Sequence, residues 1–132
     1  MNPTFKISSR DAAHLLNGLV AVNVAQHQRH IDKGGDPFAV IKAIQKGDIR
    51  YKRADPREHW QSYAELLKII RSGEGGADCE DLSAAVVAEL QHAGIRARTY
   101  VYKARKGLYH VVVKTDRWGF LDPSVSAGMR KV

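Results

Sequence analysis

The sequence predicts an α+β fold in which helices precede a small antiparallel sheet. Up to Gly94, apolar residues recur at the three- and four-residue spacing of amphipathic helices. Beyond Gly94 the period changes to two, in the stretches ARTYVYKA and LYHVVVKT, which is typical of strands. The chain has 132 residues, 44% of them hydrophobic, so we expect a single domain with its own core.

Three helices are expected in the first part of the chain. The first covers about residues 9–32, begins at a capping box of Ser8 and Asp11, and ends before Gly34. Its predicted inward stripe is Leu16, Val20, Val24, His27 and Ile31. A short second helix is expected between Asp36 and Gly47, and a third between the capping box at Ser62 and Gly73.

The fourth predicted helix carries the only cysteine of the chain. Asp78 is expected to cap it, with Asp81 at the third helical position, and Gly94 ends it. Its predicted buried stripe is Leu82, Val86, Leu90 and Ala93. Cys79 lies three residues before Leu82, so we expect the thiol on the inward face of the first turn.

The position of Cys79 bears on its chemistry. A lone cysteine is most often a buried core residue. At a helix N-terminus, however, the dipole and the unpaired N–H groups favour the thiolate, and the same groups can receive an oxyanion. Glu80 and Asp81 oppose this effect, although helical spacing is expected to turn Glu80 away from Cys79.

A nucleophilic cysteine needs a histidine base and a group that orients it. His110 lies in LYHVVV, inside an apolar strand, where an unpaired imidazole is costly to bury, and Asp122 in FLDPS follows on the next strand. Taken singly, His110 is a satisfied core histidine and Asp122-Pro123 a turn starter. Together with Cys79, they match the roles of nucleophile, base and orienting residue.

The hairpin between the last two predicted strands decides whether this hypothesis is geometrically possible. Three short antiparallel strands are expected, the last of them in WGFLDPS. If Thr115 paired with Trp118 across a two-residue loop, His110 and Asp122 would point to opposite faces of the sheet. An odd loop length or a bulge places them on the same face. The stretch TDRWG permits an odd loop.

The other five histidines and the single cysteine predict no metal site. We expect the histidines in helical or loop contexts to be solvated, namely His14, His27, His30, His59 and His92. His27 and His30 have no acidic or thiol partner at ligand spacing, and one cysteine cannot build a thiolate-rich zinc site. No cofactor is expected either.

Composition limits the location and the partners. The sequence contains no stretch of about 18 apolar residues and no N-terminal secretory segment, which predicts a soluble cytoplasmic protein without membrane contact. The net charge of +7 favours anionic partners, but we find no nucleic-acid-binding motif, so nucleic acid ranks second to a protein substrate. The tail VSAGMRKV is expected to be a surface segment.

The chain resembles the transglutaminase-like superfamily of papain-type cysteine enzymes. The matching pieces are GADCEDLSAAVVAELQHAGIRAR, LYHVVV and FLDPS, within residues 73–124. The resemblance implies a papain-like core, with N-terminal helices around a central nucleophile helix that packs on a small antiparallel sheet. It assigns Cys79 as nucleophile, His110 as general base and Asp122 as orienting residue, and it makes Trp60 or Gln61 the candidate for oxyanion stabilisation.

The resemblance also implies boundaries and a source. It gives one transglutaminase-like domain over 1–132, with a helical part at about 8–72 and a catalytic core at about 73–124. The stretches IRYKRADPREHWQSYAELL and DPSVSAGM further resemble small phage and prophage members, which places the protein in the host cytoplasm or the virion. The sequence has no acidic calcium-binding loop, so the calcium requirement of the animal enzymes is not carried over.

Three functions therefore remain open. The first is a peptidase or amidase that hydrolyses a peptide or side-chain amide through a thioester on Cys79. The second uses the same thioester but transfers a protein glutamine to an amine; we rank it lower because no second domain to organise the amine is recognisable. The third is a non-catalytic phage structural or interaction module that binds DNA or an acidic phage or host protein through its basic surface.

Overall fold

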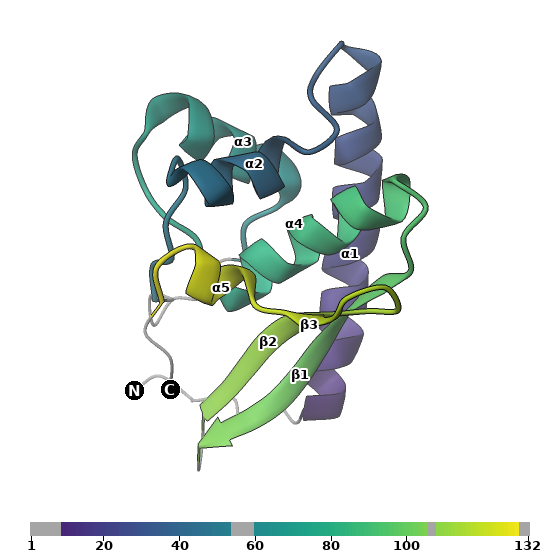
Figure 1. Cartoon of the computed structure of the whole chain (residues 1–132), viewed down its shortest axis with the longest axis vertical. Helices are drawn as coiled ribbons and strands as arrows, with labels where there is room; N and C mark the ends of the chain where they lie inside the picture. The colour runs from purple at the N-terminus through teal and green to yellow at the C-terminus, as the bar shows by residue number, and fades with distance from the viewer. Residues whose placement is uncertain (1–8, 54–59, 106–107, 130–132) are drawn as a thin grey trace.

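The computed structural model describes residues 9–53, 60–105 and 108–129. These residues form an α+β fold of five helices and a three-stranded antiparallel sheet (Figure 1). In chain order the elements are α1 (Ser9–Asp32), α2 (Ala39–Lys46), α3 (Tyr63–Ser72), α4 (Cys79–His92), β1 (Ala97–Arg105), β2 (Leu108–Thr115), β3 (Gly119–Leu121) and α5 (Pro123–Ser126). Every helix in these ranges is too short or too polar to cross a membrane.

Helix α4 is the centre of the fold, as predicted. It contacts the four other helices and both long strands. Every residue from Asp81 to Leu90 is buried, so burial extends around the whole helix and not only along the expected apolar stripe. The prediction that Ala93 is buried is wrong, because it follows the last helical residue and is exposed. Small side chains in the stretch SAAVVA let neighbouring elements approach the helix closely. Its N-terminus has the predicted capping box of Asp78 and Asp81.

The other helix boundaries also follow their sequence signals. Helix α3 has the capping box of Ser62 and Glu65 and ends at Gly73, whose φ of 73° is left-handed. Helix α2 ends at Gly47 in the same conformation. Ser8, the predicted cap of α1, lies outside the described residues.

The inward face of α1 differs from the prediction. Val24 is 41% exposed, whereas the polar residues Asn23 and His27 are buried. Asn23 Oδ1 accepts the backbone N–H of Tyr63 at 2.8 Å, and His27 Nε2 lies 2.7 Å from the carbonyl oxygen of Pro37. The expectation that His27 is solvated is therefore wrong, because backbone groups of adjoining segments satisfy its ring. His59 lies outside the described residues.

The register of the sheet meets the condition set for His110 and Asp122. Strand β2 pairs with β1 on one side and β3 on the other, and Thr115 faces Gly119 rather than Trp118. The loop between β2 and β3 thus has the odd length of three residues. Consequently His110 and Asp122 project from the same face of the sheet.

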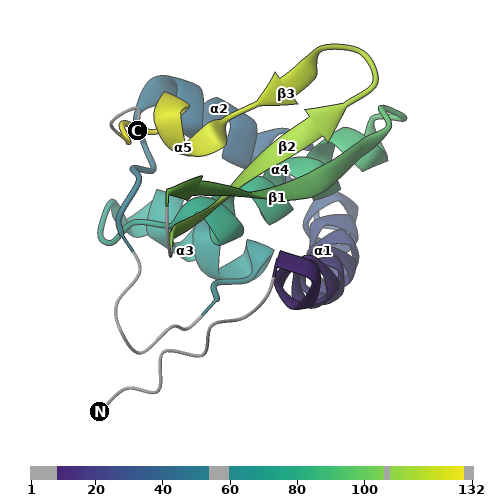
Figure 2. The same cartoon turned by 90° about the horizontal axis from the view of Figure 1, so that it is seen from below.

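The two faces of the sheet have different surroundings. Val111 and Val113 are buried on the face that α4 covers, and α1 lies alongside β1 (Figure 2). The opposite face, called here the outer face, carries Tyr102 and His110 as a cross-strand pair. Tyr100 and Phe120 lie on this face too, with their rings in contact.

The described part of the tail, residues 125–129, is not simply the surface segment we expected. Residues after Asp122 form the short helix α5, which packs on α4 and α2. Ala127 is buried in the main core, and its carbonyl oxygen accepts the backbone N–H of Tyr51 at 3.0 Å. The proline of Asp122-Pro123, which the sequence analysis treated as a turn, occupies the first turn of this helix.

Candidate active site

Cys79 is the first residue of α4 and is only 8% exposed. Its neighbours form a small apolar cluster with the buried side chains of Leu16 and Val111 and, at the margin, Leu19, Trp60 and Val101. The prediction that the thiol lies on the inward face of the first turn is confirmed. The cluster brings together residues of α1, α4, β1 and β2, which fixes the sulfur where four elements meet.

His110 and Asp122 form a direct hydrogen bond. His110 Nε2 lies 2.8 Å from Asp122 Oδ2, and the imidazole is 7% exposed. The other carboxylate oxygen, Oδ1, accepts the backbone N–H groups of Ser124 and Val125 at 3.1 and 3.3 Å. Asp122 therefore caps α5 and orients His110 at once. Because Nε2 is engaged, Nδ1 is the ring nitrogen left to exchange a proton.

The Tyr102 ring also restricts His110. The two rings meet edge to face, with centroids 5.6 Å apart and planes at 89°. This contact follows from the hairpin register, which pairs Tyr102 with His110. The imidazole is thus held by a carboxylate at one ring nitrogen and by an aromatic ring from the adjacent strand.

Cys79 approaches β2 at the residue next to His110. Strand β3 pairs with β2 only as far as Val113, so the polar groups of Val111 are left to other partners. Val111 packs against Cys79, where its backbone N–H lowers the pKa of the thiol, and its carbonyl oxygen accepts Ser83 Oγ at 3.1 Å. Ser83 lies one turn after Cys79. The first turn of α4 therefore lies along this free edge of β2.

The structure thus places all three predicted residues in one region. Among the hydrogen bonds of the described residues, none joins the Cys79 sulfur to the His110 ring; the link passes through Val111. Tyr102 gives a second indication of proximity: burial raises the pKa of its phenol, and Asp122 and Cys79 raise it further. The three groups converge on the end of β2 that β3 leaves uncovered.

The Cys79 thiol is the protonated form in this arrangement. Burial raises its pKa, and the carboxylates of Glu80 and Asp78 raise it further, while the Val111 N–H acts in the opposite direction. The expectation that the helix N-terminus yields a thiolate is not met, because desolvation outweighs it. The expected orientation of Glu80 is not met either, because its carboxylate is near enough to Cys79 to raise the pKa of the thiol.

The two oxyanion candidates have different surroundings. Trp60 is partly buried against the cluster that holds Cys79. Gln61 Nε2 donates to the carbonyl oxygen of Gly76 at 2.8 Å and to Asp81 Oδ2 at 3.4 Å, which uses both of its N–H groups. An oxyanion role for Gln61 requires these bonds to break, whereas a role for Trp60 needs no such exchange. Both roles stay predictions.

Asp81 connects this upstream segment to the cysteine helix. Its Oδ1 accepts the Gln61 backbone N–H at 2.7 Å, and its Oδ2 accepts the Asp78 backbone N–H at 3.2 Å. Burial and the neighbouring Asp78 raise the pKa of Asp81. The sequence analysis assigned Asp81 only a capping role. Helical position alone gave no signal of its contact with Gln61.

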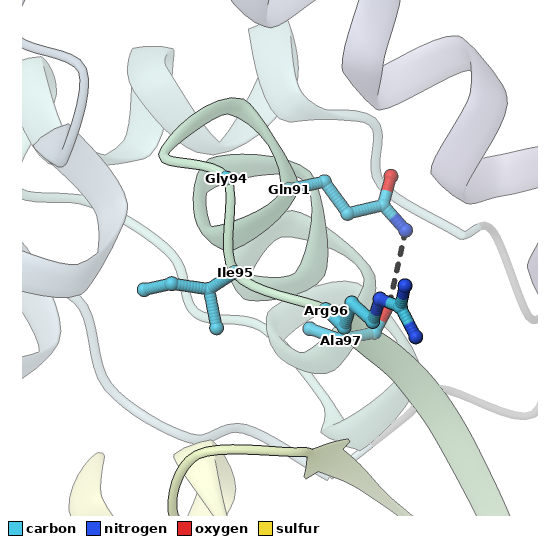
Figure 3. Close-up of a pocket in the computed structure, with 5 residues that line it drawn as sticks. All are labelled: Gln91, Gly94, Ile95, Arg96 and Ala97. Atoms are coloured by element: carbon cyan, nitrogen blue, oxygen red, sulfur yellow. Dashed lines mark hydrogen bonds between the residues drawn. The ribbon is translucent and has the colours of Figure 1, made fainter.

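A shallow hollow lies at the other end of α4. Figure 3 shows its lining residues, with Gln91 Nε2 donating to the Ala97 carbonyl oxygen at 3.0 Å. Given the rise per residue of an α-helix, the length of α4 between Cys79 and the residues that line this hollow is about 20 Å. We therefore base the candidate site on side-chain chemistry rather than on this hollow. Comparisons with protein-family models, curated proteins and solved structures find no match for this chain.

Proposed function

We propose that this protein is a cysteine-dependent acyl-transfer enzyme of the transglutaminase-like, papain-type class. The observation that carries the proposal is the hydrogen bond between buried His110 and Asp122, made one residue from the strand position that contacts Cys79. Structural histidines also find partners, but this one combines a carboxylate on Nε2 with a thiol at the adjoining backbone position. That combination matches the base, orienting residue and nucleophile of a cysteine hydrolase.

The chemistry begins with proton transfer. His110 Nδ1 takes the Cys79 proton as the sulfur attacks the carbonyl carbon of a peptide or side-chain amide, and the carbonyl oxygen becomes an oxyanion. Backbone N–H groups at the start of α4, together with Trp60, stabilise this charge. The C–N bond then breaks, His110 returns the proton to the amine, and a thioester remains on Cys79.

Hydrolysis completes the cycle. His110 takes a proton from water, the hydroxide adds to the thioester, and the C–S bond breaks to release a carboxylic acid and the thiol. Asp122 holds the imidazole in the tautomer that leaves Nδ1 free and stabilises its positive charge. If an amine replaces water, the same intermediate gives amine transfer, which is the alternative outcome at this site.

The protonation of Cys79 decides how the first step proceeds. Because burial and Glu80 raise the thiol pKa, little thiolate is present before substrate arrives. Proton transfer to His110 therefore accompanies attack instead of preceding it. This proposal places a protein or peptide substrate at the site and a phage-encoded protein in the host cytoplasm or the virion, in keeping with the sequence resemblance.

The test is the reactivity of Cys79 towards iodoacetamide, read by mass spectrometry on folded, reduced protein. We expect His110→Ala to slow alkylation by at least about tenfold near neutral pH, the lower part of the range for general-base assistance. His14→Ala, on the exposed side of α1, is the matched control and leaves the rate unchanged. Equal rates in all three proteins would show that His110 does not assist the thiol.

A second assay separates the two outcomes of the thioester. A dye-labelled casein digest reports amide hydrolysis, and incorporation of a fluorescent primary amine into the same casein reports transfer. We expect hydrolysis that is lost in Cys79→Ala. Incorporation without hydrolysis would identify the amine transferase, and neither activity, with an unreactive thiol, would leave the non-catalytic module as the better account.

A further inference from the structure

The outer face of the sheet exposes an unusual number of aromatic side chains. Tyr100 is 36%, Tyr102 39%, Trp118 52% and Phe120 58% exposed. Tyr100, Tyr102 and Phe120 share the outer face by strand register, and Trp118 lies in the turn between β2 and β3; α4 and α1 lie towards the opposite face of the sheet (Figure 2). A small sheet has no folding reason to present four large rings to water, and a patch of this kind marks an interaction surface.

Cations alternate with these rings. The guanidinium of Arg98 lies 5.8 Å from the centre of Tyr100, and that of Arg117 lies 5.7 Å from the centre of Trp118. The ammonium of Lys114 lies 5.8 Å from the centre of Phe120. Of the acidic groups nearby, Asp122 is bonded to His110, and Asp116 lies in the adjoining loop. The three cations outnumber the two carboxylates, so this face is locally positive within a protein whose net charge is +7.

We propose that this aromatic and basic face binds single-stranded nucleic acid. Unpaired bases stack on aromatic rings irrespective of sequence, while lysine and arginine neutralise the phosphates between them. The centres of Tyr100 and Tyr102 are 6.4 Å apart, and those of Tyr100 and Phe120 5.1 Å. These separations place neighbouring rings within the span of adjacent nucleotides on an extended strand.

The same features disfavour the other anionic partners. A duplex buries the faces of its bases in its own stack, so it would use the cations but leave the rings unoccupied. An acidic peptide would likewise engage the cations, yet it has no planar groups to match a row of rings. An unpaired strand needs both: rings for its exposed bases and cations for the phosphates between them.

The outer face also carries His110 and Asp122, so the stacking residues have to be separated from the catalytic pair. Tyr102 borders His110, but Tyr100, Phe120 and Lys114 have no part in the thiol chemistry. Binding of nucleic acid therefore does not depend on the proposed enzymatic function. Cys79→Ala is expected to bind as the wild type does, which keeps the failure of one proposal separate from the failure of the other.

Fluorescence anisotropy with labelled 20-nucleotide dT and rU strands tests the proposal, with a 20-base-pair duplex for comparison. We expect the single strands to bind more tightly than the duplex at 200 mM NaCl. Phe120→Ala and Tyr100→Ala should each weaken single-strand binding about 5- to 100-fold, the range for loss of one stacked base. Phe120→Tyr and Tyr100→Phe retain a ring and should bind nearly normally, even if an alanine variant does not fold.

Variants of the charged residues provide a second test in the same binding experiment. Lys114→Gln should weaken binding and lower the salt dependence by about one counterion. Lys46→Gln, with the same charge change on exposed α2, and Leu15→Ala, with a comparable loss of exposed apolar surface on α1, are the controls. Equal effects of Lys114→Gln and Lys46→Gln, or equal affinity for duplex and single strands, would overturn the proposal. Tighter binding of a labelled oligoglutamate peptide would reassign the face to an acidic polypeptide.

Discussion

At the residue scale, Asp122 performs two separable tasks. One carboxylate oxygen caps α5 and the other holds His110. From the sequence, the turn-starting and orienting roles of Asp122 are alternatives, because a single sequence shows one acidic residue and not how its two oxygens are used. The structure contains both contacts, so mutations that remove them individually have different consequences.

Two substitutions at Asp122 separate these tasks. Asp122→Asn retains a carbonyl oxygen for the cap but replaces the carboxylate that would stabilise a protonated His110. We expect at least a hundredfold loss of amidase activity with little change in the free energy of unfolding. Asp122→Ala also removes the cap and should lower that free energy by about 1 kcal/mol. Urea unfolding measures the stability of both variants. Equal unfolding free energies for Asp122→Asn and Asp122→Ala would contradict the contribution of the cap.

Glu80 is the residue that the sequence analysis misplaced. Helical periodicity describes where the Cα–Cβ bond of a residue points, but a glutamate in the first turn has enough rotatable bonds to reach back to its neighbour. In the structure this carboxylate is near enough to Cys79 to raise the pKa of the thiol. This carboxylate thereby opposes the activation that the helix N-terminus would give to the thiol.

Removal of the Glu80 charge should make the thiol more acidic. In Glu80→Gln we expect the pH profile of iodoacetamide labelling to move to lower pH, with faster labelling at pH 8. The physical reason is that the thiolate no longer forms beside a carboxylate. Glu74→Gln, in the exposed loop before α4, is the control. An unchanged profile in Glu80→Gln would mean that solvent screens this charge.

At the element scale, Glu89 joins α4 to α2 and α3. It is completely buried, and its two oxygens accept the backbone N–H groups of Val40 and Ile41 at 2.8 and 2.9 Å. The Tyr63 hydroxyl donates to it at 2.7 Å. Because Val40 and Ile41 are in the first turn of α2, this glutamate caps a helix distant in sequence. Periodicity could not predict that contact, since it specifies a face and not a partner.

The pKa of Glu89 connects this cap to pH. Burial raises it from 4.5 to about 7, so the folded protein binds more protons than the unfolded chain between these values. The contribution of Glu89 to stability is therefore full below pH 4.5 and is lost as the pH rises towards 7. Because glutamine does not titrate, the Glu89→Gln variant lacks this contribution to the pH dependence of the unfolding free energy.

We therefore expect Glu89→Gln to be less stable than the wild type at pH 5, because its amide group opposes a backbone donor. The difference in unfolding free energy should narrow by roughly 2.5 kcal/mol between pH 5 and pH 8. Urea unfolding at both values checks this, with Glu74→Gln as the exposed control. A difference that widens with pH would mean that Glu89 is ionised in the folded protein throughout.

At the scale of the whole molecule, the sequence predicts the arrangement better than it predicts individual neighbours. The change of period after Gly94 and the glycines that follow α1 to α4 predicted the order of elements up to β3, and these signals are local; α5 was not predicted. The exposure of Val24 and the burial of Asn23 and His27 depend instead on which segments pack on α1. The candidate site shows the same division: the sequence predicts His110 and Asp122 as partners but leaves open the register that joins them, and the contact of Cys79 with Val111 depends on tertiary structure.

The central position of α4 makes one further prediction about the whole molecule. Ala85 is fully buried in the main core, so Ala85→Leu adds three carbon atoms where the packing leaves no room. We expect a loss of about 1–3 kcal/mol in unfolding free energy. Ala93→Leu, at the exposed end of the same helix, makes the same chemical change and should cost little.

Because α4 contacts all the other helices and both long strands, the loss of stability in Ala85→Leu should appear equally in every part of the fold. The two tryptophans report on different regions, Trp60 beside the cysteine cluster and Trp118 on the hairpin, so single-tryptophan variants resolve them. Urea midpoints that fall together in both would support α4 as the common core, and a shift confined to one would show that the sheet and the helices unfold separately.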